Sequence, residues 1–125
     1  TDRLRRGVPV LNEVEDGFSN HIHADDLAMM CVAALNRPHG VSVYNACDDV
    51  PMKVGEWFTH LALMANLPIP ARVSRAELER TVPPLQWSFM RESRRLLNAN
   101  IKRDLDVSLR YPSALDFLEA HRGLI

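Results

Sequence analysis

The longest apolar run of the chain spans residues 27–35 and directly follows two acidic residues. Asp25 is a good N-cap and Asp26 adds negative charge to a first turn, so the pattern predicts a helix over residues 26–35. A surface helix shows one apolar stripe, whereas a helix that is apolar all round has to be covered on every side. The rest of the chain offers little strand-forming sequence for this, which indicates that a larger β-layer covers the helix.

Two short stretches on either side of this helix predict strands. Residues 19–23 form a brief strand before it, and residues 41–46 follow it with β-branched and aromatic side chains. A parallel strand needs neighbours on both sides, and this chain does not supply them. The order strand, helix, strand therefore fits a βαβ edge whose main sheet lies elsewhere. A short extended stretch is also expected at residues 8–11.

The second half of the chain is predicted to be helical. Apolar residues recur at helical spacing from residue 53 to residue 65. Ser74 with Glu77, and Ser113 with Asp116, form capping boxes, and Asn98 is expected to cap a further helix. The remaining helices are expected at residues 74–81, 85–92, 99–105 and 113–121, with an extended segment at 95–97. These patterns predict a helix-rich α/β fold with a few short strands and a single domain over residues 1–125.

Composition and charge narrow the partners and the compartment. Of 125 residues, 46% are hydrophobic and 25% are charged, and the net charge is -1, which argues against nucleic acid and anionic membranes as partners. No apolar run approaches the ~18 residues that span a bilayer, and no signal peptide is visible. Cys31 and Cys47 both lie in apolar segments and are expected to be buried thiols, which favours a reducing, cytoplasmic location. The chain begins without methionine and in mid-pattern, as an excised piece does.

The string of His21, His23 and Asp25 is the sharpest local candidate for chemistry. On a strand the two imidazoles point to one face, and with the carboxylate they offer a ligand set for zinc, as in a metal-dependent hydrolase. The alternative is that Asp25 caps the helix while both histidines pack or hydrogen-bond at a domain junction. We favour the alternative and predict no metal ligand in this chain.

Two charged clusters leave similar alternatives open. Asp48 and Asp49 form either an acid–base carboxylate pair or a loop-ordering pair. Arg91, Arg94 and Arg95 form either a clamp for a substrate phosphate or carboxylate, or a solvated helix face. No Gly-x-Gly-x-x-Gly loop and no Tyr-x-x-x-Lys pair occurs in the sequence, so we predict no cofactor-binding and no catalytic residue here.

Several strings resemble the extended short-chain dehydrogenases, the NAD-dependent epimerase/dehydratase family. Residues 20–28 (NHIHADDLA) resemble the family's IHVDDLA element, and residues 43–46 (VYNA) resemble its late VYNV strand. Residues 98–105 (NANIKRDL) resemble a helix near the family's end, and residues 110–113 (RYPS) resemble its close, as in a bacterial branch labelled nucleoside-diphosphate-sugar epimerase. Ser19 stands where nucleotide-sugar epimerases usually carry arginine.

The resemblance implies the carboxyl-terminal, substrate-binding part of a Rossmann-type oxidoreductase or isomerase. The amino-terminal dinucleotide-binding domain, which would bind NAD or NADP and carry the catalytic residues, is absent from this chain. Asn20, His21, Arg91 and Arg94 are then the candidates for binding a small-molecule substrate, either a sugar or a nucleotide sugar. A homodimer is one expected way to cover the apolar helix. The alternative is a non-catalytic helical interaction module, whose apolar helix binds a partner.

Overall fold

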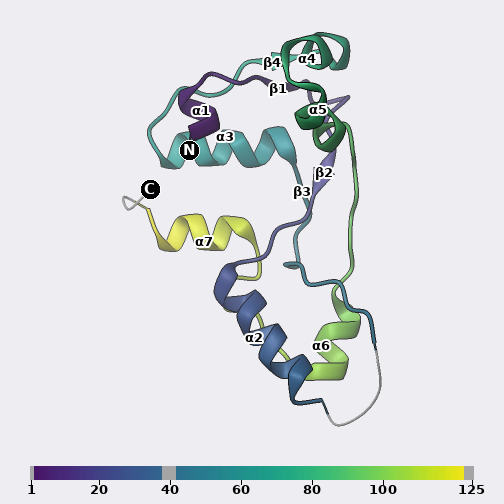
Figure 1. Cartoon of the computed structure of the whole chain (residues 1–125). Coiled ribbons are helices and arrows are strands. Elements are labelled where there is room, and N and C mark those ends of the chain that lie inside the picture. The colour runs from purple at the N-terminus through teal and green to yellow at the C-terminus, as the bar shows by residue number, and fades with distance from the viewer. Residues whose placement is uncertain (1, 38–41, 123–125) are drawn as a thin grey trace. The chain divides into compact units, whose positions relative to one another are not determined.

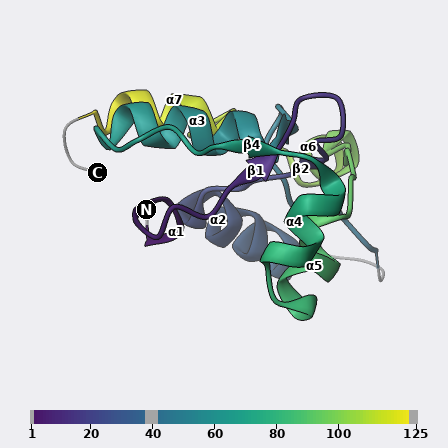
Figure 2. The same cartoon turned by 90° about the horizontal axis from the view of Figure 1, so that it is seen from above.

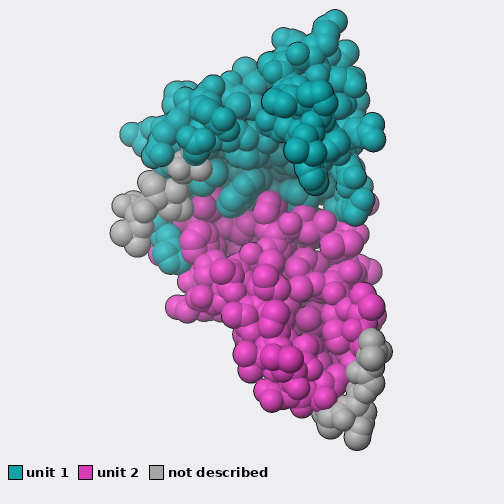
Figure 3. Space-filling model, viewed as in Figure 1, with its two compact units in different colours: residues 1–19, 52–94, 121–125 teal, residues 20–51, 95–120 magenta. Residues whose placement is uncertain are grey.

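The computed structural model describes residues 2–37 and 42–122, which form two compact units. Unit 1 comprises residues 1–19, 52–94 and 121–125, and unit 2 comprises residues 20–51 and 95–120 (Figure 3). Each unit is thus assembled from segments that are distant in the sequence. The helix-rich α/β class predicted from the sequence is confirmed, and the prediction of a single domain stays a prediction.

Unit 1 carries most of the secondary structure (Figure 1). Its strands form two short pairs, of which β1 and β4 run parallel and β2 and β3 run antiparallel. The elements in chain order are α1 (Asp2–Arg5), β1 (Val10–Leu11), β2 (Phe18–Ser19), β3 (Met52–Lys53), α3 (Val54–Met64), β4 (Arg72–Val73), α4 (Arg75–Thr81) and α5 (Pro84–Met90).

A small apolar core holds α4 and α5 together in unit 1, and both views show these helices side by side (Figures 1 and 2). The core consists of the buried side chains of Leu11, Leu78, Val82 and Trp87. Leu78 is completely excluded from solvent. The predicted cap of α4 is present, because the Ser74 hydroxyl accepts a hydrogen bond of 3.3 Å from the Glu77 N–H. Local capping and a few buried side chains therefore fix this part of the unit.

Unit 2 consists of α2 (Ala24–Leu35), α6 (Ala99–Leu105) and α7 (Ala114–Ala120) with their connecting loops. Its apolar core contains the buried side chains of Met30, Ile101 and Val107, by which α2 packs against α6. The predicted capping box of α7 is confirmed: the Ser113 N–H donates to the Asp116 carboxylate, and the Asp116 N–H donates to the Ser113 hydroxyl.

The apolar helix α2 is covered on one side only. Met30 is 1% exposed, but Val32 is 58% exposed and Leu35 is 85% exposed. The chain therefore leaves this helix largely open, as the lack of strand-forming sequence predicts. Cys31 lies on the open side, so its prediction as a buried thiol is wrong, whereas Cys47 is buried as expected.

The predicted cap of α2 is also wrong in one detail. The helix begins at Ala24, and its N-cap is His23, whose Nδ1 accepts a hydrogen bond of 3.2 Å from the Asp25 N–H. Asp25 therefore lies inside the first turn, where its charge still suits the helix dipole. Asp26 is buried and accepts hydrogen bonds from the backbone N–H groups of Arg110 (2.7 Å) and Tyr111 (3.0 Å).

Two strand predictions need correction. The sequence predicts a strand at residues 19–23, but the strand found there, β2, spans only Phe18–Ser19. The strand expected at residues 41–46 is not formed in its described part, residues 42–46, and Val43 there is 92% exposed; residue 41 lies outside the described residues. β-Branched side chains favour extended backbone, but a strand also needs a ladder partner, and the described chain offers none to this segment.

The other predicted helices match the structure to within a few residues. The cap of α6 differs, because the Asn98 side chain makes no capping bond and instead donates to the Cys47 carbonyl (2.9 Å) and the Asp49 carboxylate (2.7 Å). The sequence pattern missed α1, β3 and β4, which are too short to produce periodicity. In the described part of the chain, every helix is too short or too polar to cross a bilayer.

Candidate functional site

The predicted substrate residues Asn20 and His21 lie next to each other in unit 2. Asn20 Oδ1 accepts a hydrogen bond of 2.8 Å from the Leu96 N–H, and the His21 carbonyl accepts one of 2.6 Å from the Asp48 N–H. The imidazole of His21 is half-buried, and burial lowers its pKa below the ordinary value of 6.5. The ring therefore favours its neutral form, which carries one N–H donor and one acceptor nitrogen.

The predicted substrate residues Arg91 and Arg94 lie at the end of unit 1, after α5. Both side chains are exposed. Arg91 is the C-cap residue of α5, and its backbone N–H donates to the Trp87 carbonyl at 3.0 Å. Arg94 Nη2 forms an ion pair of 2.8 Å with Glu92. Each pair of candidates thus sits within its own unit, and their convergence on one substrate stays a prediction.

The zinc hypothesis for His21, His23 and Asp25 gains no support from the geometry. His23 Nδ1 caps α2, and its ring packs against Tyr111 and Phe117 with centroid separations of 4.6 and 4.8 Å. Among the described residues, no group of three or more His, Cys, Asp or Glu side chains is placed to hold a metal ion. The capping and packing alternative accounts for His23.

The loop after residue 46 separates its two carboxylates into different environments. The carboxylate oxygens of Asp49 lie 2.6 and 2.7 Å from the ammonium of Lys102, and one of them accepts a hydrogen bond from the Asn98 side chain. Burial acts to raise the pKa of Asp49, but the bonds to Asn98 and Lys102 outweigh burial, so the pKa is lowered. Asp48 is only 3% exposed, and its Oδ2 has no hydrogen-bond partner in the described structure. Burial raises the pKa of Asp48 from 3.8 to about 6.

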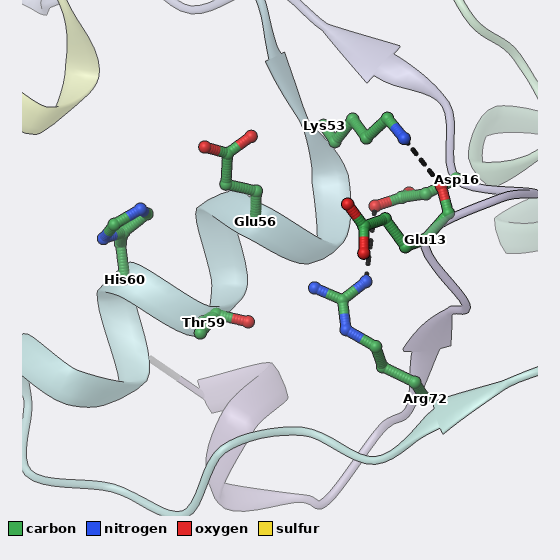
Figure 4. A pocket seen from close by; sticks show the side chains of 7 residues that line it. All are labelled: Glu13, Asp16, Lys53, Glu56, Thr59, His60 and Arg72. Atoms are coloured by element: carbon green, nitrogen blue, oxygen red, sulfur yellow. Dashed lines mark hydrogen bonds and ion pairs between the residues drawn. The ribbon is translucent and has the colours of Figure 1, made fainter.

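A cavity of about 320 Å³ in unit 1 is lined mainly by charged and polar side chains (Figure 4). Its walls come from the loop before β2, from the start of α3 and from β4. Glu56 and His60 project from the same side of α3, and Arg72 reaches in from β4. The lining residues are Glu13, Asp16, Lys53, Glu56, Thr59, His60 and Arg72.

Asp16 organises the inner wall of this cavity. Its side chain is 2% exposed, and Oδ2 accepts a hydrogen bond of 2.7 Å from the Gly55 N–H and lies 4.0 Å from Arg72 Nη1. Burial raises the pKa of Asp16, against the opposing effects of that hydrogen bond and of Arg72. A Cβ atom at Gly55 would lie 2.8 Å from both Arg72 Nη1 and Asp16 Oδ2, so these two side chains would have to shift to admit one.

Sequence reasoning missed this cavity. The spacing of Glu56, Thr59 and His60 places them together on the polar face of the predicted helix, which is a usable signal. Asp16 and Arg72 carry no local signal, because the parallel pairing of β1 with β4 brings their segments together.

Comparisons with known proteins give a likeness to a solved structure. No family model matches the chain, and no curated protein matches it. The chain is similar to a solved structure described as a functionally unknown conserved protein from Silicibacter pomeroyi DSS, with 32% sequence identity and a TM-score of 0.73. The likeness covers 86% of this chain and 39% of the other, so the chain corresponds to well under half of that longer protein.

Proposed function

We propose that this chain is the carboxyl-terminal, substrate-binding part of an NAD(P)-dependent epimerase/dehydratase, a nucleoside-diphosphate-sugar epimerase-like oxidoreductase of Rossmann type. The observation that carries the proposal is the uncovered side of α2 together with the extended, unpaired segment that follows it. Both features are what a βαβ edge looks like when the main sheet is contributed by another part of a longer protein.

The exposed apolar surface supports this interpretation. Leu27, Val32 and Leu35 on α2 are 39, 58 and 85% exposed, and Val43 in the following segment is 92% exposed. An apolar surface of this kind marks an interface rather than ordinary protein surface. The backbone of residues 42–46 also lacks ladder bonds in the described structure, so a sheet edge would satisfy it. The length of the similar solved structure is consistent with a longer protein.

In the complete protein, NAD(P) would supply hydride transfer. The residues of this chain would bind and orient the substrate, with Asn20 and His21 offering neutral hydrogen-bonding groups and Arg91 and Arg94 offering cationic ones. The hydroxyl groups of a sugar need neutral hydrogen-bonding groups, and the phosphates of a nucleotide sugar also need cationic groups. The 125-residue chain by itself is expected to be inactive.

The decisive test is the coding sequence immediately upstream of Thr1. We expect a Gly-rich strand–turn–helix followed by a Tyr-x-x-x-Lys pair, and an upstream region that encodes neither contradicts the proposal. Titration calorimetry of the 125-residue chain with NAD⁺ and NADP⁺ is the matching control. No binding in the micromolar range is expected, because the phosphate-cradling loop is not in this sequence.

A non-catalytic helical interaction module is the second candidate, and the same open side of α2 favours it. Sedimentation velocity distinguishes the two. A part that lacks its covering sheet is expected to dimerise or aggregate through α2, whereas a stable monomer at high concentration favours an autonomous module. A homodimer formed through α2 should dissociate when Val32 is replaced by aspartate.

A further inference from the structure

We propose that the cavity of unit 1 is a binding site for a small dipolar molecule of the free amino acid class. Its ammonium group would lie against Glu13 and Glu56, and its carboxylate would lie against Arg72 and Lys53. All the lining residues belong to unit 1, so the inference does not depend on the proposed oxidoreductase function.

The volume of the cavity suits a small ligand. A volume of about 320 Å³ lies at the small end of the range for ligand sites, which is roughly 300–1,000 Å³. An amino acid or another ligand of similar size fits.

The acceptor side of the cavity is formed by two exposed carboxylates, those of Glu13 and Glu56. Neither side chain makes a hydrogen bond or an ion pair within the described residues. Figure 4 shows Glu56 projecting from α3 beside His60, and Glu13 lying between α3 and Arg72. An ammonium group carries three N–H donors and no acceptor, so it suits this pair of carboxylates.

The donor side is formed by Arg72 and Lys53, which are anchored but not saturated. Arg72 Nη1 donates to the Leu11 carbonyl at 3.1 Å, and Lys53 Nζ donates to the Glu13 carbonyl at 2.6 Å. A guanidinium group has five N–H donors and an ammonium has three, so both retain free donors. The Arg72 side chain is 37% exposed, which leaves its outer face open to a ligand carboxylate.

The mixed charge of the lining selects a dipolar ligand over a singly charged one. The lining holds three carboxylates and two permanent cations. A simple anion would approach Arg72 against the field of the carboxylates, and a simple cation would approach Glu56 against the field of Arg72 and Lys53. A molecule with both charges compensates both walls at once. The side chain of Asp16 is 2% exposed and lies 4.0 Å from Arg72 Nη1, so it balances part of the charge of Arg72.

The test is a two-dimensional NMR titration of the isotope-labelled 125-residue chain with glycine and L-alanine, and with acetate, ethylamine and glycerol as separate probes. We expect the amino acids to shift the backbone signals of the cavity residues and to bind about tenfold more tightly than acetate or ethylamine. If acetate binds as tightly as glycine, the cavity is an anion site. If ethylamine binds as tightly as glycine, the cavity is a cation site. Either result overturns the proposal. Preferential binding of glycerol, or no shift at about 50 mM of either amino acid, overturns it too.

Glu56→Gln is the decisive variant, because Glu56 has no partner among the described residues and its loss should not disturb the fold. It is expected to weaken glycine binding about tenfold. Glu79→Gln, at an exposed position of α4 outside the cavity lining, is the matched control and should leave binding unchanged. Arg72→Gln should also abolish binding, but Arg72 supports the Leu11 carbonyl, so its circular dichroism spectrum has to match that of the parent chain. Unchanged glycine binding in Glu56→Gln contradicts the assigned ammonium position.

Discussion

Replacing Asp48 with asparagine should make the protein more stable at neutral pH, although it removes a charged residue from a buried loop. Asp48 is 3% exposed, and its Oδ2 has no hydrogen-bond partner among the described residues. Burial is the main cause that raises its pKa from 3.8 to about 6, and the nearby carboxylates of Asp49 and Asp116 act in the same direction. Backbone N–H groups of Val50 and Ala114 oppose the shift without cancelling it.

The magnitude and the sign follow from proton linkage. Because the pKa is raised on folding, the folded state holds the proton more tightly, and this contribution to stability is fully present below pH 3.8 and is lost as the pH rises through about 6. The difference between the two values corresponds to ~3 kcal/mol at pH 7. Asparagine carries no charge, so it avoids the penalty of ionising a buried Asp48. It places an N–H₂ donor where Oδ2 stood, and burying that donor without a partner costs ~1–3 kcal/mol. The net gain at pH 7 is therefore about 1 kcal/mol.

Urea unfolding followed by circular dichroism at pH 4, 5, 6 and 7 measures the effect. The donor cost does not vary with pH, so the stability of Asp48→Asn relative to the parent chain should rise by ~2 kcal/mol between pH 4 and pH 7. Asp49→Asn is the matched control. The pKa of Asp49 is lowered, so this variant should lose stability relative to the parent as the pH rises, by about 0.5–1 kcal/mol because the pair with Lys102 is partly exposed. A pH-independent difference for Asp48→Asn, or one with the sign of the control, refutes the reasoning.

Three further predictions concern the packing of each unit and the open helix. Asp26→Ala should lower the free energy of unfolding by ~3 kcal/mol in urea titrations, because it leaves the N–H groups of Arg110 and Tyr111 without their buried acceptor; a loss below 1 kcal/mol contradicts that role. Gly55→Ala should destabilise by ~1–3 kcal/mol, since its Cβ would collide with Asp16 and Arg72, and thermal unfolding measures the change; an unchanged midpoint shows that the inner wall yields freely. Val32→Asp should change the free energy of unfolding by no more than ~0.5 kcal/mol, because Val32 is 58% exposed. It should also lower the weight-average sedimentation coefficient by dissociating any self-associated form. A large loss of stability shows that α2 is covered.

The parts of the fold that the sequence predicts well are those with local causes. Ser74 and Ser113 accept the hydrogen bonds that a capping box requires, and the helices they begin follow directly. Asn98 shows the limit of such reasoning. Its side chain is drawn to the Cys47 carbonyl and to Asp49, partners far along the chain, so its local capping role is replaced by a tertiary one.

Non-local pairing explains the remaining differences. The segment at residues 42–46 has the composition of a strand, but composition cannot provide a partner strand. The opposite happens at Arg72 and Val73, where a two-residue strand too short for any pattern pairs with β1 and carries Arg72 into the cavity. Cys31 shares the apolar surroundings of a core residue in sequence and yet is exposed, because exposure depends on what covers the helix rather than on the helix itself.

The residues that carry the family resemblance have structural tasks in this chain, and this bears on what the resemblance can imply. In the NHIHADDLA string, His23 caps α2, and Asp26 binds the backbone at Arg110 and Tyr111. The RYPS string at residues 110–113 thus meets the NHIHADDLA string through one buried carboxylate. The two strings are distant in sequence, but Asp26 of the first accepts the backbone hydrogen bonds that Arg110 and Tyr111 of the second donate. A motif that is explained by such a link is evidence for a shared way of folding, whereas chemistry has to be argued from groups with free capacity. Glu13, Glu56 and Arg72, which lie outside both motifs, keep such capacity at the cavity of unit 1, so the test of ligand binding there is separate from the test of Asn20 and His21 as substrate residues.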